Sequence, residues 1–129
     1  MKMLNQDEEA DTEVTWEDQQ NINSFSRLNM KIQNLEDQYE EKKKEKEYLD
    51  DLSSELELAD EDDLVKYRIG DAFVSLTLEA CQQRIESEQE ILSKDLEEFS
   101  SKIDGITDSM NKLKVVLYKK FGTSINLER

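Results

Sequence analysis

The sequence predicts a mainly α-helical protein in which two long helices form an antiparallel coiled-coil hairpin, joined by one β-hairpin. Three observations support this fold class. Apolar residues recur at alternating intervals of three and four along two segments, which is the repeat of a coiled coil. The chain has no proline and only three glycines, so long helices would meet few breakers. Only one stretch, YRIGDAFVSLT at residues 67–77, has the pattern of β-structure.

The composition limits both the core and the partners of the chain. Hydrophobic residues make up 36% of the 129 residues and charged residues 38%, so we expect an elongated coiled-coil domain and no large globular core. The formal net charge of −15 repels phosphate, which argues against nucleic acid and anionic membranes as direct partners. The sequence contains no apolar run of roughly 20 residues and no signal-peptide pattern, so we expect a soluble, cytoplasmic protein.

The chain is predicted to consist of a tail and one domain. Residues 1–14 are acidic and lack an apolar period, so we expect a disordered tail. The coiled-coil domain, residues 15–129, would contain a helix over about 16–58, a β-hairpin over about 64–76 and a helix over about 78–121. Because the helices are nearly equal in length and closely connected, they should fold back on each other. Both chain ends would then lie at one end of the coil and the β-hairpin at the other.

The first helix has a predicted start and a predicted seam. Thr15 has the position of an N-cap, with Glu17 and Asp18 in the first turn, where carboxylates suit free backbone N–H groups. Asp18 stands where a capping box would place Glu or Gln, so that motif is matched in part. The predicted seam consists of Phe25, Leu28, Ile32, Leu35, Tyr39, Lys42, Lys46, Leu49, Ser53 and Leu56. Lys42 and Lys46 interrupt the apolar stripe, and we expect the coil to be least stable there.

The second helix has the same features. Thr77 is a plausible N-cap, with Glu79 in the first turn. The predicted seam consists of Leu78, Gln82, Ile85, Gln89, Leu92, Leu96, Phe99, Ile103, Ile106, Met110, Leu113 and Leu117. Gly105 lies off this stripe and should not end the helix, whereas Gly122 has the position of a C-terminal stop.

The β-segment is predicted to be an assembly element. Apolar and basic residues alternate up to Gly70-Asp71, and glycine at the first position of a two-residue connection suits a type II′ turn. An isolated two-stranded hairpin is marginally stable and has two open edges, so the missing strands should come from other subunits, as a shared sheet or β-barrel. The residues predicted to support assembly are Val65, Tyr67, Ile69, Gly70, Phe73, Val74 and Leu76. The alternative is that the hairpin only caps the end of the coil.

These features together resemble the beta-type prefoldin subunits. The resemblance covers about residues 14–128 and depends most on two segments, ADEDDLVKYRIGDAF before and through the hairpin and YKKFGTSINLE at the end. The stretch VTWEDQQNINSFSRL near the amino end adds to it. The coiled-coil repeat alone would be weak support, because any coiled coil has it.

The resemblance implies a heterohexamer of two alpha-type and four beta-type subunits, in which the β-hairpins form a double β-barrel that carries six coiled coils. It also implies an ATP-independent co-chaperone that captures unfolded actin and tubulin chains and passes them to the cytosolic chaperonin. The partners would then be other prefoldin subunits, unfolded clients and the chaperonin.

The free end of the coil offers a surface on which a client could be held. Ile22 and Phe25 of the first helix face Leu117, Tyr118 and Phe121 of the second, and Ile125 and Leu127 follow beyond Gly122. Together these side chains form more apolar surface than a two-helix seam can bury. If the coil frays at this end, these side chains would form a flexible apolar surface with little sequence preference. The alternative is that Ile125 or Leu127 folds back onto the last helical turn, as an apolar contact accompanying the Gly122 cap. Both arrangements can occur in succession, with the packed form opening when a client arrives.

Three functions of other classes compete with this assignment. The clustered carboxylates of ADEDDL, residues 59–64, could hold Mg²⁺ in a partner enzyme, but their spacing is unspecific and a solvated acidic loop that turns the chain is favoured. A coiled-coil tether or adaptor that docks through its β-hairpin predicts a homodimer or a two-protein complex without affinity for unfolded chains. An enzyme is not expected, because the chain has no histidine and Cys81 has no evident base. The sequence predicts no cofactor and no metal site.

Overall fold

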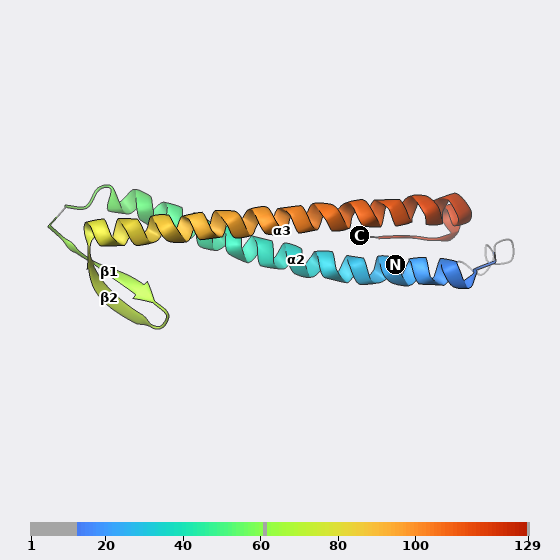
Figure 1. Ribbon diagram of the computed structural model, residues 1–129, viewed down its shortest axis with the longest axis horizontal. Coiled ribbons are helices and arrows are strands. Elements are labelled where there is room, and N and C mark those ends of the chain that lie inside the picture. The colour runs from blue at the N-terminus through green and yellow to red at the C-terminus, as the bar shows by residue number, and fades with distance from the viewer. Residues whose placement is uncertain (1–12, 61, 129) are drawn as a thin grey trace. The chain divides into compact units, whose positions relative to one another are not determined.

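The computed structural model describes residues 13–60 and 62–128. The elements are α2 (Trp16–Leu56), β1 (Leu64–Ile69), β2 (Ala72–Thr77), α3 (Leu78–Phe121) and a short 3-10 helix, η1 (Gly122–Ser124) (Figure 1). Two long helices packed against each other and joined by an antiparallel β-hairpin confirm the predicted fold class. Apart from residues 13 and 14, the predicted acidic tail lies outside the described residues.

The chain divides into two compact units. Unit 1 extends to Asp37 and resumes at Ser100, so it contains the first part of α2, the last part of α3 and the C-terminal segment. Unit 2 consists of Gln38–Phe99 and contains the rest of both helices and the β-hairpin. Among the described residues, no helix has both the length and the apolar character needed to cross a membrane.

Each long helix has a threonine as its N-cap, in the position before its first residue. The Asp18 N–H donates to Thr15 Oγ1 at 3.1 Å, and the Thr15 N–H donates to a carboxylate oxygen of Asp18 at 3.0 Å. An aspartate therefore completes the capping box that the sequence suggested only in part. At the start of α3, the Ala80 N–H donates to Thr77 Oγ1 at 3.2 Å. Both predicted N-caps are confirmed.

The seam of α2 follows the predicted spacing. Every predicted seam residue from Phe25 to Leu56 is buried or half-buried. Lys42 and Lys46 are half-buried, because their aliphatic stems cover the seam while their ammonium groups reach carboxylates in solvent. Lys46 Nζ lies 3.1 Å from an oxygen of Asp50, and Lys42 Nζ lies 3.8 Å from an oxygen of Glu45.

The seam of α3 departs from the prediction at one position. Gln82 is exposed, whereas Cys81, one residue earlier, is fully buried. The fixed spacing placed an amide on the inner face, although the small apolar thiol beside it can be buried without a hydrogen-bond partner. The other predicted seam residues of α3 are buried or half-buried, and the helix continues through Gly105.

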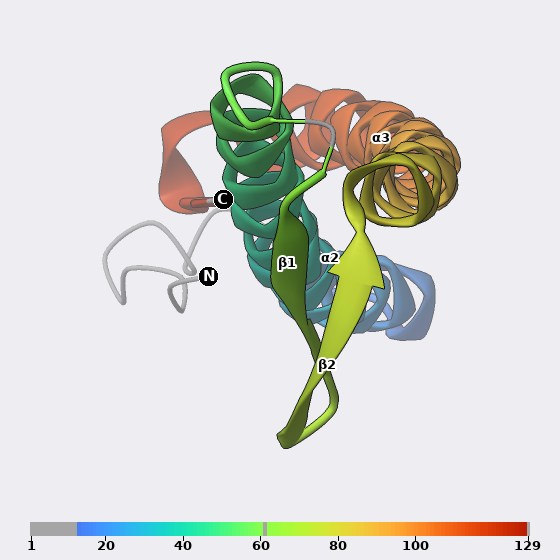
Figure 2. The ribbon, with the colours of Figure 1, turned by 90° about the vertical axis from the view of Figure 1, so that its left-hand side faces the viewer.

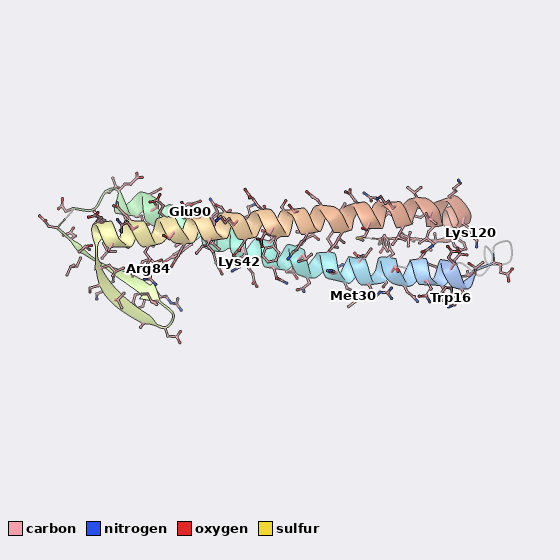
Figure 3. The ribbon with its side chains drawn as sticks, in the orientation of Figure 1. Trp16, Met30, Lys42, Arg84, Glu90 and Lys120 are labelled. Atoms are coloured by element: carbon pink, nitrogen blue, oxygen red, sulfur yellow. The ribbon has the colours of Figure 1, made fainter. Side chains whose placement is uncertain are left out.

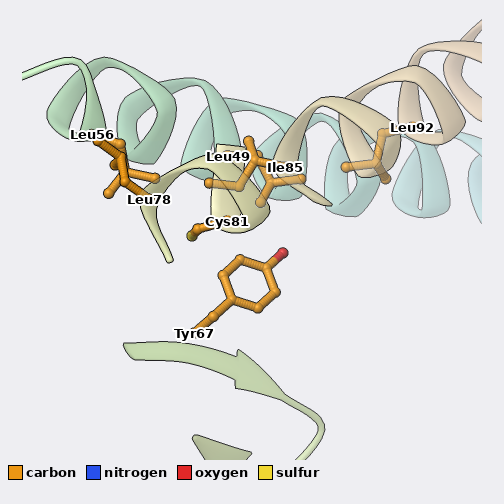
Figure 4. Packing of buried hydrophobic residues seen from close by; sticks show 7 residues of the cluster. All are labelled: Leu49, Leu56, Tyr67, Leu78, Cys81, Ile85 and Leu92. Carbon is orange, nitrogen blue, oxygen red and sulfur yellow. The ribbon is translucent and has the colours of Figure 1, made fainter. Parts of the chain in front are cut away.

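Unit 2 has a core to which both helices and the β-hairpin contribute (Figure 4). The buried members of this cluster are Leu49, Leu56, Tyr67, Leu78, Cys81, Ile85 and Leu92. Tyr67 is the member that comes from the hairpin, and its ring lies toward the helices in Figure 4. The half-buried Val65 and Leu76 pack against the same cluster. One face of the hairpin is therefore fixed to the coiled coil.

The hairpin has the predicted two-residue connection, Gly70-Asp71. β1 and β2 pair antiparallel, from Leu64 opposite Thr77 to Ile69 opposite Ala72, and lie side by side in Figure 2. Gly70 has a φ of 59°, in the left-handed region where a glycine carries no steric penalty. This positive φ in a two-residue connection is the geometry that the Gly-Asp pair predicted.

The chain reverses direction after α3. Gly122 has a φ of 57° and ends the helix, as the sequence predicted. Beyond this point the C-terminal segment runs back beside the helices of unit 1 (Figure 1). We call residues 122–128 the hook. Ile125 and Leu127 of the hook are buried in unit 1.

Candidate functional site

The β-hairpin presents two faces of different character. On the inner face Tyr67 is buried and 5% exposed, with Val65 and Leu76 half-buried beside it. Phe73 projects from the opposite face and is 68% exposed, and the side chain of Leu64 on that face is exposed as well. The cross-strand register explains this division, because neighbouring residues of a strand point to opposite faces.

The remaining residues predicted for assembly lie toward the turn. Ile69 and Val74 are exposed although they share the inner face with Tyr67, and Gly70 forms the turn. Among the described residues the sheet has two strands, so both of its outer edges are unpaired. The structure thus divides the predicted set into residues that hold the hairpin to the coil and residues that remain available to a partner.

Tyr67 is held by polar groups of α3 as well as by burial. Its hydroxyl donates to a carboxylate oxygen of Glu88 at 2.6 Å, and the guanidinium of Arg84 lies 5.6 Å from the centre of its ring. Burial, and next the Glu88 carboxylate, raise the pKa of Tyr67 far above its ordinary value. Burial also raises the pKa of Cys81, with Glu88 as a smaller cause, so the thiol stays protonated and inert.

A groove of about 940 Å³ lies between the hairpin and the two helices of unit 2. Its walls include exposed Tyr48 of α2, Phe73 of β2 and Ile91 of α3, together with several lysines, Arg68 and three carboxylates. Sequence analysis missed this groove. Tyr48 and Ile91 are apolar residues off the coiled-coil seam, which is the signal that could have indicated it.

The apolar residues predicted for the free end all lie in unit 1, and most of them are buried. Ile22, Phe25, Leu117 and Phe121 belong to the core of the unit, and Tyr118 is partly exposed. Ile125 and Leu127 are 4% and 3% exposed. The fold-back that the sequence left as an alternative is therefore the arrangement in the structure. We call these seven residues the apolar end.

The hook is held to both helices by polar contacts. The Leu127 N–H donates to the hydroxyl of Tyr118 at 3.0 Å, and Asn29 Nδ2 donates to the backbone carbonyl of Glu128 at 3.5 Å. Asn29 Oδ1 is buried and has no hydrogen-bond partner within the described part of the chain. Sequence analysis missed Asn29, because a single polar residue beside a seam carries no distinctive pattern.

A charged contact joins the two helices of unit 1. The ammonium of Lys120 donates to the carboxylate of Asp18, which also accepts from Thr15. Burial alone would raise the pKa of Asp18, but the hydrogen bonds from Lys120 and Thr15 outweigh it and lower the pKa below its ordinary value. The carboxylate is thus charged at neutral pH and ties the start of α2 to the end of α3.

Unit 1 also carries apolar side chains on its outside. Trp16 is 79% exposed and Met30 is 71% exposed on α2 (Figure 3), and Val115 and Val116 are exposed on α3. Sequence analysis did not assign these residues, because they lie off the predicted seam. Their signal would have been large apolar residues at solvent positions of a helix.

Comparisons with known proteins agree with one another. A family model described as prefoldin subunit matches residues 19–124. Prefoldin subunit 4 of Saccharomyces cerevisiae is 41% identical over 129 residues, covering 100% of both chains. Prefoldin subunit 4 of Homo sapiens is 40% identical over 119 residues, covering 92% of this chain and 89% of the human one. The crystal structure of the prefoldin beta subunit from Thermococcus strain KS-1 superposes with a TM-score of 0.78 at 14% identity, covering 86% of this chain and 97% of that one.

Proposed function

The chain belongs to the prefoldin family as a beta-type subunit, and we propose that it captures unfolded actin- and tubulin-class polypeptides and passes them to the cytosolic chaperonin. Membership makes the chain a non-enzymatic component of the prefoldin co-chaperone complex, associated with other prefoldin subunits. The proposed capture needs no ATP, because it depends on apolar contact alone. Its compartment would be the cytoplasm, where the chaperonin acts.

The observation that supports the proposal most strongly is a β-hairpin that is packed on the coil by one face and exposed elsewhere. Unit 2 fixes one face of its β-hairpin to the coil and leaves Phe73 and Ile69 exposed, and within the described residues both outer strand edges are unpaired. Such a hairpin gains stability when further strands complete its sheet, which supports a heterohexamer of two alpha-type and four beta-type subunits. In this assembly Val65, Tyr67 and Leu76 would position the hairpin, with Gly70 forming its turn, while Ile69, Phe73 and Val74 would meet neighbouring strands.

Unit 1 supplies the proposed client surface. Its apolar end is closed by a short segment, the hook, and its outer side chains include Trp16, Val115 and Val116. Apolar surface of this kind can hold unrelated sequences, because hydrophobic burial has no directional requirement. The apolar end has to open before its buried side chains meet a client, and the exposed side chains would make the first contact.

The proposal is tested with the assembled complex. Unfolded actin is diluted from denaturant into buffer with the complex that contains this chain, and aggregation is followed by light scattering. We expect suppression at stoichiometric amounts, equally with and without ATP. The matched control is the same amount of this chain without its partner subunits. Aggregation at the rate of actin alone, or suppression that requires ATP, would contradict the proposal.

A further inference from the structure

We propose that five residues of the apolar end, Ile22, Phe25, Leu117, Tyr118 and Phe121, form a peptide-binding site for an extended segment with two large aliphatic side chains at alternate positions. Ile125 and Leu127 of the hook occupy this site in the free chain. The inference rests on the proposed function and specifies the client chemistry that unit 1 accepts. The hook thus acts as an intramolecular ligand, which a client segment that binds more tightly displaces.

The first observation is the conformation of the hook. Ile125 has φ −126° and ψ 144°, which is extended backbone. Ile125 and Leu127 are buried while Asn126 and Glu128 are exposed, so side chains alternate between inside and outside as on a β-strand. A site that accepts this segment accepts any extended chain with an aliphatic residue, a spacer and another aliphatic residue.

The second observation is that the helices form hydrogen bonds with the backbone of the hook. Tyr118 accepts a hydrogen bond from the N–H of Leu127, and Asn29 donates one to the carbonyl of Glu128. The same amide holds a buried oxygen, Asn29 Oδ1, that has no partner within the described residues. A carboxamide can bond both the C=O and the N–H of a peptide backbone, so one acceptor remains for a longer or better-placed segment. Backbone contacts of this kind require an extended chain and impose no particular side chains.

Competition between hook and client follows from the connection of the hook to α3. A short tether gives the hook an effective concentration on the order of millimolar, so a free segment must displace it. The apparent affinity for that segment is the intrinsic affinity multiplied by the fraction of molecules in which the hook is open. Replacing the two aliphatic side chains of the hook, Ile125 and Leu127, should therefore vacate the site. The residues that line the site stay in place: Ile22, Phe25, Leu117, Tyr118 and Phe121.

The test uses the full chain and a fluorescein-labelled peptide, FGTSINLE, that reproduces residues 121–128. Binding is measured by fluorescence anisotropy to the natural chain, to the double variant Ile125→Ser/Leu127→Ser, and to the control Asn126→Ser. We expect the double variant to bind about tenfold more tightly than the natural chain, because its site is vacant. The control should bind like the natural chain, and a peptide with both aliphatic residues replaced by serine should not bind.

A second variant keeps the inference testable if the double variant loses helicity in circular dichroism. Tyr118→Phe, in the natural chain, removes the acceptor for the Leu127 N–H and leaves every apolar side chain in place. Hydrogen exchange of the Leu127 amide should then become several-fold faster, with α3 protected as before. The inference would be overturned if the peptide bound equally to the natural chain and to a folded double variant. It would also be overturned if the peptide with both aliphatic residues replaced by serine bound as tightly as FGTSINLE, or if exchange of the Leu127 amide were unchanged in Tyr118→Phe.

A competition assay separates this inference from the proposed function. The labelled peptide is bound to the assembled complex that carries the double variant, and unfolded actin is added. Displacement of the peptide supports the inference and the function together. Capture of actin without displacement overturns the inference and leaves the function standing. If the complex captures no actin and the peptide still binds tenfold more tightly to the variant, the inference stands and the proposed function fails.

Discussion

The hydroxyl of Tyr67 is the polar contact that holds the hairpin to α3. It donates at 2.6 Å to Glu88, a charged acceptor, and the ring contributes to the core of unit 2. A bond to a charged acceptor is stronger than one between neutral groups, although partial exposure of Glu88 weakens it. This hydrogen bond adds to the apolar contacts of Val65 and Leu76 that set the direction in which the hairpin presents Phe73 and Ile69.

Replacing Tyr67 by phenylalanine should lower the free energy of unfolding by about 1 kcal/mol, because the Glu88 carboxylate loses its donor and the ring stays in place. Urea denaturation followed by circular dichroism measures this loss. Tyr48→Phe is the matched control, since Tyr48 is an exposed tyrosine of the same unit and should change little. A loss in the control as large as in Tyr67→Phe would contradict the assignment.

The same residue predicts a dependence on alkaline pH. Burial and the Glu88 carboxylate raise the folded-state pKa of Tyr67 above its ordinary value of 10.0. Above pH 10 the unfolded chain therefore loses this proton while the folded chain keeps it, so the contribution of Tyr67 to stability falls as pH rises. The stability difference between the natural chain and Tyr67→Phe should shrink from pH 8 to pH 11. A difference that stays constant over this range would show that Tyr67 is not perturbed.

The contribution of Asp18 to stability depends on pH in the opposite direction to that of Tyr67. Burial opposes its charge, but bonds from Lys120 and Thr15 lower its pKa below 3.8, so its contribution is complete above that value and is lost as pH falls further. Asp18→Asn removes the charge that binds Lys120 and should cost about 1 kcal/mol at pH 7, and this cost should shrink as the pH is lowered below 3.8. Thermal unfolding at pH 7 and at a series of lower pH values measures this. Glu17→Gln, an exposed carboxylate of the same turn, is the control and should have no such effect.

At the scale of elements, the coiled-coil seam could be predicted from the sequence because it depends on periodicity alone. Phe25, Ile32 and Leu117 are fully buried as the spacing required. Gln82 was assigned wrongly because a fixed spacing ignores chemistry, and the neighbouring Cys81 took its place in the core. The threonine caps and the glycine turn were also predictable, since each depends on two or three adjacent residues.

The contacts of the apolar end could not be predicted in the same way. The fold-back of the hook brings it to partners far along the chain, such as Asn29 on α2, which donates to the Glu128 carbonyl, and no local pattern connects them. The sequence left the fold-back and an open surface as alternatives, and the structure shows the first. The groove beside Tyr48 was missed for the same reason, because it exists only once the hairpin has packed on the helices.

The β-hairpin should be necessary for assembly but not for helix formation. Replacing Ile69 and Phe73 together by aspartate puts two charges on its exposed apolar surface, which a completed sheet would have to bury at high cost. We expect co-expression with the other prefoldin subunits to give no complex, with helicity nearly unchanged. The matched control replaces two exposed apolar residues outside the hairpin, Leu58 and Met30, by aspartate. Complexes formed normally by the Ile69/Phe73 variant would exclude the hairpin as the assembly element.

At the scale of the whole molecule, we propose that unit 2 serves assembly and unit 1 serves capture. Unit 2 contains the hairpin, whose outer edges are unpaired within the described part of the chain, and unit 1 contains the apolar end and the hook. The net charge of −15 suits this arrangement, since it keeps a protein with exposed apolar groups from associating with its own copies. A basic client segment would be attracted by the same field, and this attraction should weaken with salt.

We propose that this chain completes its hairpin with strands of other subunits. Light scattering of the purified chain, alone and after mixing with alpha-type prefoldin subunits, gives its mass in each state. We expect a shift to a defined complex with the mass of two alpha-type and four beta-type subunits. A stable homodimer that does not bind these partners would exclude this assembly and would favour a coiled-coil tether.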